Sequence, residues 1–316
     1  MNQKSQTEVI NPQHKIGWIG TGRMGFAMAR RLLDRGCDLA VYNRTRSKAE
    51  PLTDSGATIV DSPAELADRD IVFTMVSGPE DLFEVICGPK GLLSASGTPQ
   101  MVVDCSSVSE EGSLKVRNAL DERGAAMLSA PVSGNAKVVQ AGMLTMVVSG
   151  PDHAFSVAEP YLNVFGRGVT YVGEGELARM VKICHNVLLG VVTQCLAEIT
   201  VLAEKGGVPR HALLDFINKS VMGSIFSRYK SPAFVNLDWT PTFTPVLLRK
   251  DLDLGLAAGE RLGVPMAVAQ ATRDLVDQVI SNGSTDCDFG ILLEQQAEAS
   301  GLKLESEDLE VNDGLH

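Results

Sequence analysis

The stretch Lys15–Gly25, KIGWIGTGRMG, decides how the first half of the chain folds. Its apolar start is typical of a short buried strand, and its glycines follow with the spacing G-x-G-x-x-G. Gly20 permits a tight turn, Gly22 a close approach to the backbone, and Gly25 close packing of a helix on the strand. Because the loop opens a helix, its N–H groups and the helix dipole favour an anion such as a dinucleotide pyrophosphate. The predicted phosphate loop consists of Gly20, Thr21, Gly22, Arg23, Met24 and Gly25.

The same spacing also occurs in ordinary strand-to-helix turns, so the rest of the chain has to support this interpretation. Short β-rich runs bounded by Gly, Pro and Ser alternate with helical segments, beginning with a helix at Arg23–Arg35. The expected strands are Lys15–Gly20, Asp38–Tyr42, Ile71–Val76, Met101–Asp104, Leu144–Ser149 and Val169–Val172. This β-α-β repetition predicts an α/β domain with a mainly parallel, doubly wound Rossmann sheet, which the last two strands complete.

The pattern changes after Gly175. The segment Glu176–Lys205 contains no proline and predicts one helix long enough to connect two domains. Further helices are expected at Pro209–Lys219, Pro245–Leu262, Pro265–Ser281 and Phe289–Ala299. The predicted organisation is a disordered tail at 1–14, a dinucleotide-binding domain at 15–176, an all-helical domain at 177–302 and an acidic tail at 303–316. Within that tail, Glu305–His316 is sparse in apolar residues and is expected to be disordered.

Composition narrows the class of protein. Hydrophobic residues make up 44% and charged residues 21%, as in ordinary globular proteins. The formal net charge of −11 argues against nucleic acid or an anionic membrane as a partner. The six cysteines lie far apart with no C-x-x-C pair, so neither a metal site nor a disulfide framework is expected. A polar N-terminus and the lack of a long uninterrupted apolar run predict a soluble, cytoplasmic protein.

The end of the second expected strand bears on which dinucleotide is bound. A site for NAD usually has Asp or Glu there, where it holds the ribose hydroxyls. Here the chain reads VYNRTR over residues 41–46, with no carboxylate. Arg44 can accept a 2′-phosphate, while Asn43 and Thr45 can form hydrogen bonds. The sequence therefore favours NADP(H), with NAD(H) possible. The alternative is that Arg44 and Arg46 are solvated surface charges.

Two polar loops follow later strands, where ligands bind in open α/β sheets. The first is Asp104–Val108; the second is Ala130–Asn135, followed by AGMLT at 141–145. Their hydroxyls and N–H groups could bind a carboxylate or a carboxamide, and ordinary turn chemistry explains each loop equally well. The candidates are Ser106, Ser107, Ser133, Gly134 and Asn135.

The segment from Gly173 to Asn186, GEGELARMVKICHN, carries the chemistry we expect. Lys182 and Asn186 are four residues apart and so share one helix face, amid apolar neighbours. One interpretation is that this lysine extends its amine to the surface. Alternatively, Lys182 donates a proton to the oxyanion left by hydride transfer to a carbonyl, and takes it back in the reverse reaction. Asn186 can orient the substrate oxygen. His185 could assist in this chemistry, but the interpretation we favour is a structural histidine within a packed helix.

Taken in order, these motifs resemble the β-hydroxyacid dehydrogenase family. They are the G-x-G-x-M-G loop, D-x-S-S, A-P-V-S-G with A-G-x-L-T, K-I-C-H-N, and Lys250-Asp251-Leu252, and the resemblance runs from about Lys15 to Ala299. The family includes 3-hydroxyisobutyrate dehydrogenase, tartronate semialdehyde reductase and the glyoxylate or succinic semialdehyde reductases. It implies a Rossmann domain followed by an all-helical domain like that of 6-phosphogluconate dehydrogenase, and assembly into homodimers or homotetramers.

The resemblance also implies roles for single residues. Lys182 matches the catalytic lysine and Asn186 its substrate-orienting partner. Ser133, Gly134 and Asn135 match the loop that binds the carboxylate of a small substrate. The positions implied to contact the cofactor are Ser107, which also contacts substrate, Met75 and Val76 near the adenosine ribose, and Lys250 from the helical domain.

Departures from the family pattern leave alternatives open. Asn135 stands where glycine is usual, and Val108-Ser109-Glu110 follows the serines where proline is common. The resemblance therefore implies a 3-hydroxy acid and its semialdehyde as substrates, without naming the acid. An imine reductase of the same fold is the runner-up, but those enzymes usually carry Asp or Tyr in place of Lys182. A non-catalytic scaffold that binds NADP would predict loss of the Lys182–Asn186 pair, which is intact.

Overall fold

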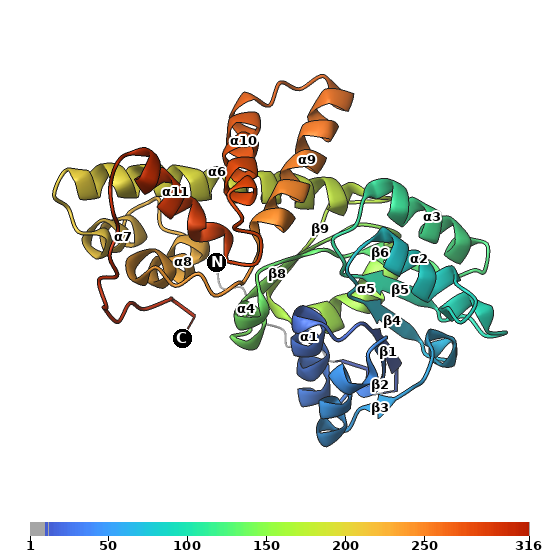
Figure 1. Ribbon diagram of the computed structural model, residues 1–316. Helices are drawn as coiled ribbons and strands as arrows, with labels where there is room; N and C mark the ends of the chain where they lie inside the picture. Colours follow the sequence, from blue (N-terminus) through green and yellow to red (C-terminus); the bar gives the residue numbers. More distant parts are fainter. Residues whose placement is uncertain (1–9, 12, 316) are drawn as a thin grey trace, which may run out of the picture. The chain divides into compact units, whose positions relative to one another are not determined.

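The computed structural model describes residues 10, 11 and 13–315 (Figure 1). The chain divides into two compact units, 1–182 and 183–316. The division falls inside one continuous helix, α6 (Leu177–Lys205), whereas the sequence placed the boundary just before that helix, near Glu176.

Unit 1 is built on a parallel sheet of six strands in the order β3-β2-β1-β4-β5-β6. Its strands are β1 (Lys15–Ile19), β2 (Asp38–Tyr42), β3 (Thr58–Ile59), β4 (Ile71–Thr74), β5 (Met101–Asp104) and β6 (Ala126–Ser129). The order reverses between β1 and β4, and in such sheets ligands bind beyond the carboxyl ends of the strands at this reversal. The predicted doubly wound Rossmann domain is confirmed.

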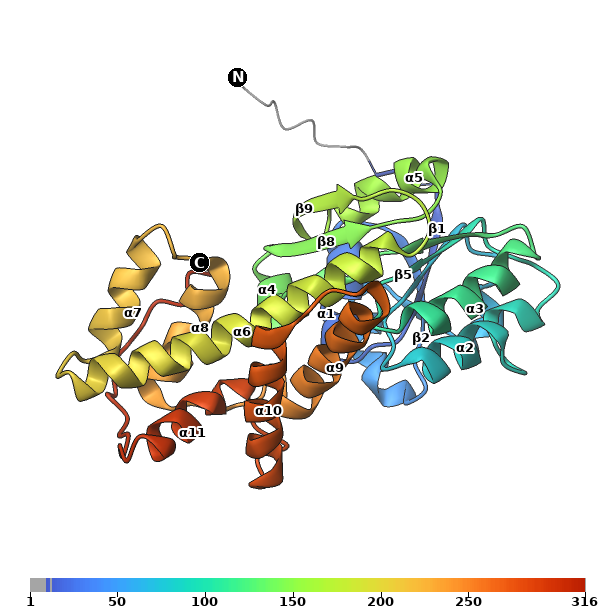
Figure 2. The ribbon, with the colours of Figure 1, turned by 90° about the horizontal axis from the view of Figure 1, so that it is seen from above.

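Alternate strand residues supply two separate cores because successive side chains of a strand point to opposite faces. Trp18 of β1 and Phe73 of β4 stack with 5.5 Å between ring centroids on the face covered by α1 and α5. Val72 and Val102 face the other core, beneath α2 and α3 (Figures 1 and 2). These helices are α1 (Arg23–Asp34), α2 (Pro79–Cys87), α3 (Glu110–Asp121) and α5 (Asp152–Leu162). Short 3₁₀ turns lie at Arg46–Lys48, Glu50–Ser55, Pro63–Leu66 and Leu92–Ser94.

The last two expected strands do not complete the parallel sheet. They form a separate three-stranded sheet of β7 (Val132–Ser133), β8 (Leu144–Val148) and β9 (Gly166–Tyr171), in which β7 and β8 are antiparallel. One isolated bridge, between Ser129 and Ser149, links β6 to the end of β8. Pro131 lacks a backbone N–H and cannot extend the ladder of β6, so the chain turns away there.

Unit 2 is helical. Within the described residues it comprises most of α6 together with α7 (Arg210–Lys219), α8 (Ile225–Asn236), α9 (Pro245–Leu262), α10 (Ala267–Ser281), a 3₁₀ turn (Phe289–Ile291) and α11 (Leu292–Ala299). Helix α8 was not predicted from the sequence because Pro232 lies inside it. It begins at a reciprocal cap, in which the Ser224 and Ser227 side chains each bond the other's backbone N–H.

Residues 301–315 form neither helix nor strand, but they pack against the helices of unit 2, which differs from the disorder expected for Glu305–His316. The carboxylate of Glu307 accepts the backbone N–H groups of Arg210 and His211 at 2.8 and 3.0 Å. These N–H groups begin α7 and have no partner inside the helix, so a carboxylate there is stabilised. Leu315 is buried. At least one acidic residue of this C-terminal segment, Glu307, thus makes a specific contact with a helix start.

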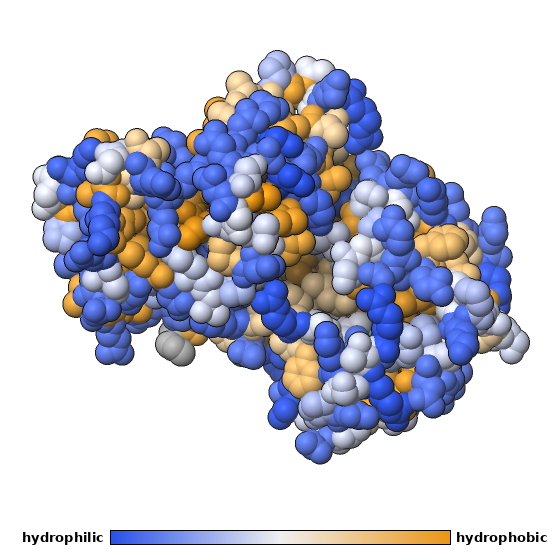
Figure 3. All heavy atoms as spheres, viewed as in Figure 1, coloured by the Kyte–Doolittle hydropathy of each residue, from blue (hydrophilic) through white to orange (hydrophobic). Residues whose placement is uncertain are grey.

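By length and composition α6 is long and apolar enough to cross a membrane, and half of its most apolar window is buried within the protein. A core helix of a soluble protein has this pattern. On the face seen in Figure 3, hydrophilic side chains are mixed with scattered apolar ones, as on an ordinary globular surface.

Candidate functional site

Backbone packing requires two glycines of the phosphate loop. Gly20 follows β1 with φ +97°, and a Cβ atom there would lie 2.2 Å from the carbonyl oxygen of Met75. Gly25 lies in the first turn of α1, where a Cβ atom would lie 2.0 Å from the carbonyl oxygen of Gly20. The loop, the end of β4 and the helix can approach this closely only without side chains at these positions.

Gly22 serves a different purpose. It is the N-cap residue of α1, and a Cβ atom on it would have no neighbour within 4 Å among the described residues. The start of α1 has no side-chain cap and no acidic residue in its first turn. Beside it, the buried Thr21 hydroxyl has no hydrogen-bond partner among the described residues. Open space, N–H donors and an available hydroxyl fit the phosphates of a dinucleotide.

The end of β2 is braced against this loop. Asn43 accepts the Thr21 N–H at 2.8 Å and donates to the Thr45 carbonyl oxygen at 2.8 Å, so it holds the loops after β1 and β2 together. The side chain of Arg44 is 81% exposed and pairs with Asp81 of α2 at 2.9 Å. Arg46 pairs with Asp61 and Glu50. The two arginines are thus held at the surface by acidic neighbours.

The loops after β4 and β5 are joined by a buried hydroxyl. Ser106 is fully buried, and its Oγ accepts the Val76 N–H at 2.9 Å. The next residue, Ser107, is exposed. Of the two serines that the sequence singled out here, Ser106 is therefore committed to structure, and Ser107 is the one accessible to a ligand.

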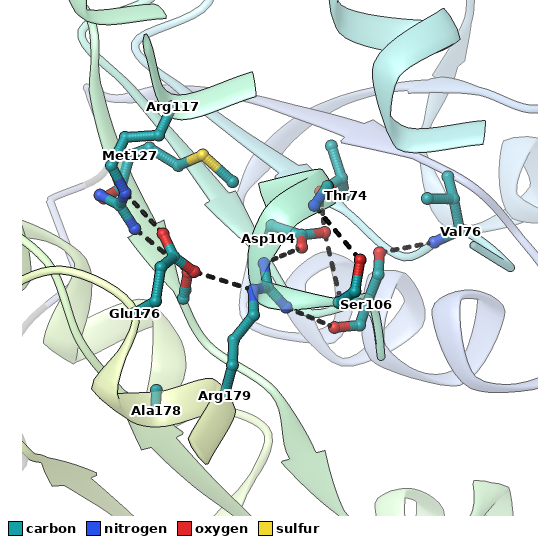
Figure 4. Close-up of polar contacts among 12 residues, drawn as sticks. Thr74, Val76, Asp104, Ser106, Arg117, Met127, Glu176, Ala178 and Arg179 are labelled. Carbon is teal, nitrogen blue, oxygen red and sulfur yellow. Dashed lines mark hydrogen bonds and ion pairs between the residues drawn. The ribbon is translucent and has the colours of Figure 1, made fainter. Parts of the chain in front are cut away.

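A buried ion pair ties the loop after β5 to the first turn of α6 (Figure 4). The side chains of Arg179 and Asp104 are 2% and 0% exposed, and Nη2 of Arg179 lies 2.6 Å from Oδ2 of Asp104. Nη1 of Arg179 donates to the Ser106 carbonyl oxygen at 3.0 Å. The other oxygen of Asp104 accepts the Thr74 hydroxyl at 2.6 Å and the Ser106 N–H at 3.2 Å.

Glu176 extends this network to a second arginine. Its carboxylate accepts Nε of Arg117 at 2.6 Å, Nε of Arg179 at 3.0 Å and the Ser129 hydroxyl at 2.9 Å. Burial by itself raises the pKa of the Glu176 carboxyl, but Arg117 and Arg179 outweigh burial and hold this pKa below its usual range. Sequence inspection missed these residues because polar side chains that meet only in the folded chain leave no local pattern.

The predicted catalytic pair lies further along α6. Lys182 is partly buried, and Asn186 is 5% exposed. Asn186 Nδ2 donates to Oδ2 of Asp251 at 2.6 Å, while its Oδ1 lies 3.0 Å from Nδ1 of His185. The other Asp251 oxygen lies 3.4 Å from Nζ of Lys250. Asp251, the neighbour of Lys250 in the K-D-L motif, thus fixes the amide orientation of Asn186, which we did not predict.

The candidate substrate loop is partly structural. Gly134 has φ +135°, and a Cβ atom there would lie 2.8 Å from the side chain of Val138. Asn135 caps α4 (Ala136–Gln140), since its Oδ1 accepts the Val138 N–H at 3.1 Å. Its amide therefore has a local role where the resemblance implied a contact with substrate. Ser133 is partly exposed in β7.

Two parts of the sequence match known protein-domain families. Residues 15–173 match the NAD binding domain of 6-phosphogluconate dehydrogenase, and residues 176–295 match the NAD-binding domain of NADP-dependent 3-hydroxyisobutyrate dehydrogenase. The chain is 31% identical over 281 residues to glyoxylate/succinic semialdehyde reductase 1 of Arabidopsis thaliana, which covers 89% of this chain and 97% of the relative. It is 34% identical over 262 residues to 2-(hydroxymethyl)glutarate dehydrogenase of Eubacterium barkeri, with 82% and 87% covered.

Among solved structures, Psf3 in complex with NADP+ and 2-OPP is similar with a TM-score of 0.79 and 26% identity, covering 89% of this chain and 99% of that one. The fold, the glycine loop and these matches define an oxidoreductase that binds a nicotinamide dinucleotide. The chain belongs to the β-hydroxyacid dehydrogenase family.

Two alanine substitutions separate ligand binding from folding in the phosphate loop. Gly22→Ala places a methyl group in open space, so we expect the melting temperature to fall by no more than about 4 °C. We expect the affinity for NADPH to fall by about tenfold or more, because the methyl group occupies the space in front of the N-terminus of α1. Gly25→Ala is the matched control and should lower the melting temperature much further. Thermal unfolding and NADPH fluorescence measure both; unchanged affinity in Gly22→Ala would contradict phosphate binding there.

Glu176 should make the free energy of unfolding depend on pH in the acidic range. The pKa of this carboxyl is lower in the folded chain than in the unfolded chain. The ionised carboxylate therefore contributes fully to the free energy of unfolding above the unfolded pKa of about 4.3, and this contribution is lost as the pH falls through the lower pKa of the folded state. Glu176→Gln should therefore be less stable than wild type at neutral pH, with the difference narrowing below about pH 4. Urea unfolding across this range measures it, and Glu260→Gln, which removes an exposed carboxylate, is the control. A difference independent of pH would contradict the assignment.

Proposed function

We propose that this protein is an NADP(H)-dependent oxidoreductase that interconverts a small 3-hydroxy acid and its semialdehyde. The observation that carries the proposal is the pair of Lys182 and Asn186 on one face of α6, with the amide of Asn186 fixed by Asp251 at 2.6 Å. The activities of two similar proteins, a glyoxylate/succinic semialdehyde reductase and a 2-(hydroxymethyl)glutarate dehydrogenase, support this class of substrate.

Lys182 supplies the proton that the reaction needs. When bound, the nicotinamide of the cofactor would supply or take up the hydride. When a carbonyl is reduced, the substrate oxygen becomes an anion, and the Lys182 ammonium neutralises it by donating a proton. In the reverse direction the neutral amine accepts the proton of the alcohol. Asn186 orients the same oxygen by donating the second hydrogen of its Nδ2 group to it, while the first hydrogen anchors the amide on Asp251.

The preference for NADP(H) over NAD(H) rests on the end of β2. The chain has Asn43 and Arg44 there, with no carboxylate to accept ribose hydroxyls. The exposed Arg44 guanidinium can turn from Asp81 to a 2′-phosphate, with Thr45 beside it. Met75 and Val76 would line the adenosine ribose of a bound cofactor, and Lys250 would be a further residue that contacts it. Arg46 is already engaged by two carboxylates and contributes less.

The carboxylate of the substrate binds the hydroxyls of Ser107 and Ser133 and the backbone N–H of Gly134. Asn135 contributes mainly by capping α4, which holds this loop in shape. We place the enzyme in the cytoplasm as a homodimer or homotetramer. Exposed apolar residues of α6, such as Leu188 at 61% and Leu202 at 73%, support assembly through this helix.

Removing the amine tests the mechanism. In Lys182→Ala we expect kcat for aldehyde reduction to fall by about 10² to 10⁴, the usual contribution of a general acid, while NADPH still binds. A panel of glyoxylate, succinic semialdehyde, tartronate semialdehyde and methylmalonate semialdehyde, followed by NADPH absorbance, measures turnover. Lys205→Ala, which removes an exposed amine at the other end of α6, should leave kcat unchanged. Undiminished turnover in Lys182→Ala would refute the mechanism.

Reversing the charge at Arg44 tests the cofactor preference. Arg44→Asp should weaken NADPH binding at least tenfold (roughly), since a charge-assisted bond to the 2′-phosphate is lost, and should change NADH binding little. Fluorescence titration with both nucleotides measures this. Arg30→Asp, at an exposed arginine of α1 paired with Asp34, controls for the change in net charge. Equal losses for NADPH and NADH would disprove the assignment.

A further inference from the structure

Arg179 forms hydrogen bonds with all three nitrogens of its guanidinium. Nε donates to Glu176 at 3.0 Å, Nη1 to the Ser106 carbonyl oxygen at 3.0 Å and Nη2 to Asp104 at 2.6 Å. Only 2% of the side chain is exposed, so bulk solvent does not compete for these bonds. A planar fork held at three points has one orientation, so the backbone that carries it is fixed as well (Figure 4).

The partners of Arg179 belong to the loop that precedes the exposed Ser107. Asp104 ends β5, and Ser106 is bonded to Val76 in the loop after β4. One guanidinium therefore holds the first turn of α6 against the loop after β5, which Ser106 in turn joins to the loop after β4 at the carboxyl end of the sheet. Ligands of parallel α/β sheets bind at this end.

Arg179 also shares a helix face with the candidate catalytic residues. Lys182 and Asn186 follow it by three and seven residues, and at about 100° per residue all three lie within an arc of about 60°. Fixing the rotation of α6 at Arg179 therefore fixes the direction in which the Lys182 side chain leaves the helix. A shift of about 1 Å at a reacting group is enough to lower a rate about 10²-fold.

Stability alone is a poor reason for this arrangement. The cluster of Arg117, Arg179, Asp104 and Glu176 balances two cations with two anions, but burying each ion costs several kcal/mol, and well-packed apolar residues often stabilise a protein equally well. Apolar residues cannot form directional hydrogen bonds between a helix and specific atoms of a loop, as Arg179 does. This favours a role in geometry.

We propose that Arg179 is a positioning residue that aligns Lys182 with the loop of Ser106 and Ser107. The inference rests on the proposed function, in which Lys182 transfers the proton. Arg179 does not touch the reacting atoms; it acts through Lys182.

The test replaces the fork and keeps the charge. Arg179→Lys presents a single ammonium that cannot hold three partners, so kcat should fall at least tenfold (roughly), with KM for the aldehyde and NADPH affinity within about twofold of wild type. Arg117→Lys is the matched control. Arg117 is a buried arginine that shares Glu176 but, among the described residues, bonds Met127, Ser129 and Gly175 instead of the loop after β5. It should keep most of its kcat. Equal losses in both variants would overturn the proposal.

A double mutant shows whether Arg179 acts through Lys182. Adding Arg179→Lys to Lys182→Ala should reduce the remaining turnover by less than about twofold, because the group being positioned is already gone. A further loss of about tenfold would overturn the inference. If Lys182→Ala alone keeps full turnover, the proposed function itself fails, so the two failures are distinguishable. Should Arg179→Lys not fold, Asp104→Asn combined with Arg179→Gln removes both charges together and must show the same loss of kcat.

Discussion

Asp104 and Arg179 meet where water is excluded, and this contact sets the geometry of the candidate site. Burying either charge without a partner is costly, so each one stabilises the other in this buried position. Asp104 also accepts hydrogen bonds from the Thr74 hydroxyl and the Ser106 backbone N–H. It is therefore an acceptor shared by the end of β4, the loop after β5 and the first turn of α6. A helix of 29 residues thus starts from a point determined by the ends of two strands.

A constraint at one end of a helix determines the whole helix face. Hydrogen bonds along α6 transmit its rotation from Arg179 to Lys182 and Asn186. Within unit 2 the same helix is held again, since Asn186 bonds Asp251 and a Cβ atom at Gly190 would lie 3.0 Å from Leu248. Each unit therefore binds its own part of α6 with buried contacts, and the predicted proton donor lies between these two anchors along the helix.

The features that were predicted from the sequence have local causes. The glycine spacing, the alternation of strands and helices and the apolar run of α6 follow from neighbouring residues, so the fold class was predictable. Other features depend on residues far apart in the chain. These are the separate sheet of β7 to β9, the ion pair of Arg179 with Asp104, and the hydrogen bond between Asn186 and Asp251. The acidic C-terminal segment was misjudged because composition does not reveal that Glu307 meets the open start of α7. The role of Lys182 stays a prediction.

The net charge of −11 does not conflict with anionic ligands, because charges are screened beyond about 8 Å and local groups decide. The helices after β1, β4 and β5 all begin at the carboxyl end of the sheet, but they are not equivalent. Helices α2 and α3 carry two acidic residues each in their first turns, which oppose a further negative charge. Helix α1 carries none and begins at Gly22, where no side chain fills the space. Among these three helix starts, the distribution of acids thus favours that of α1 for binding an anion, as the predicted phosphate loop requires.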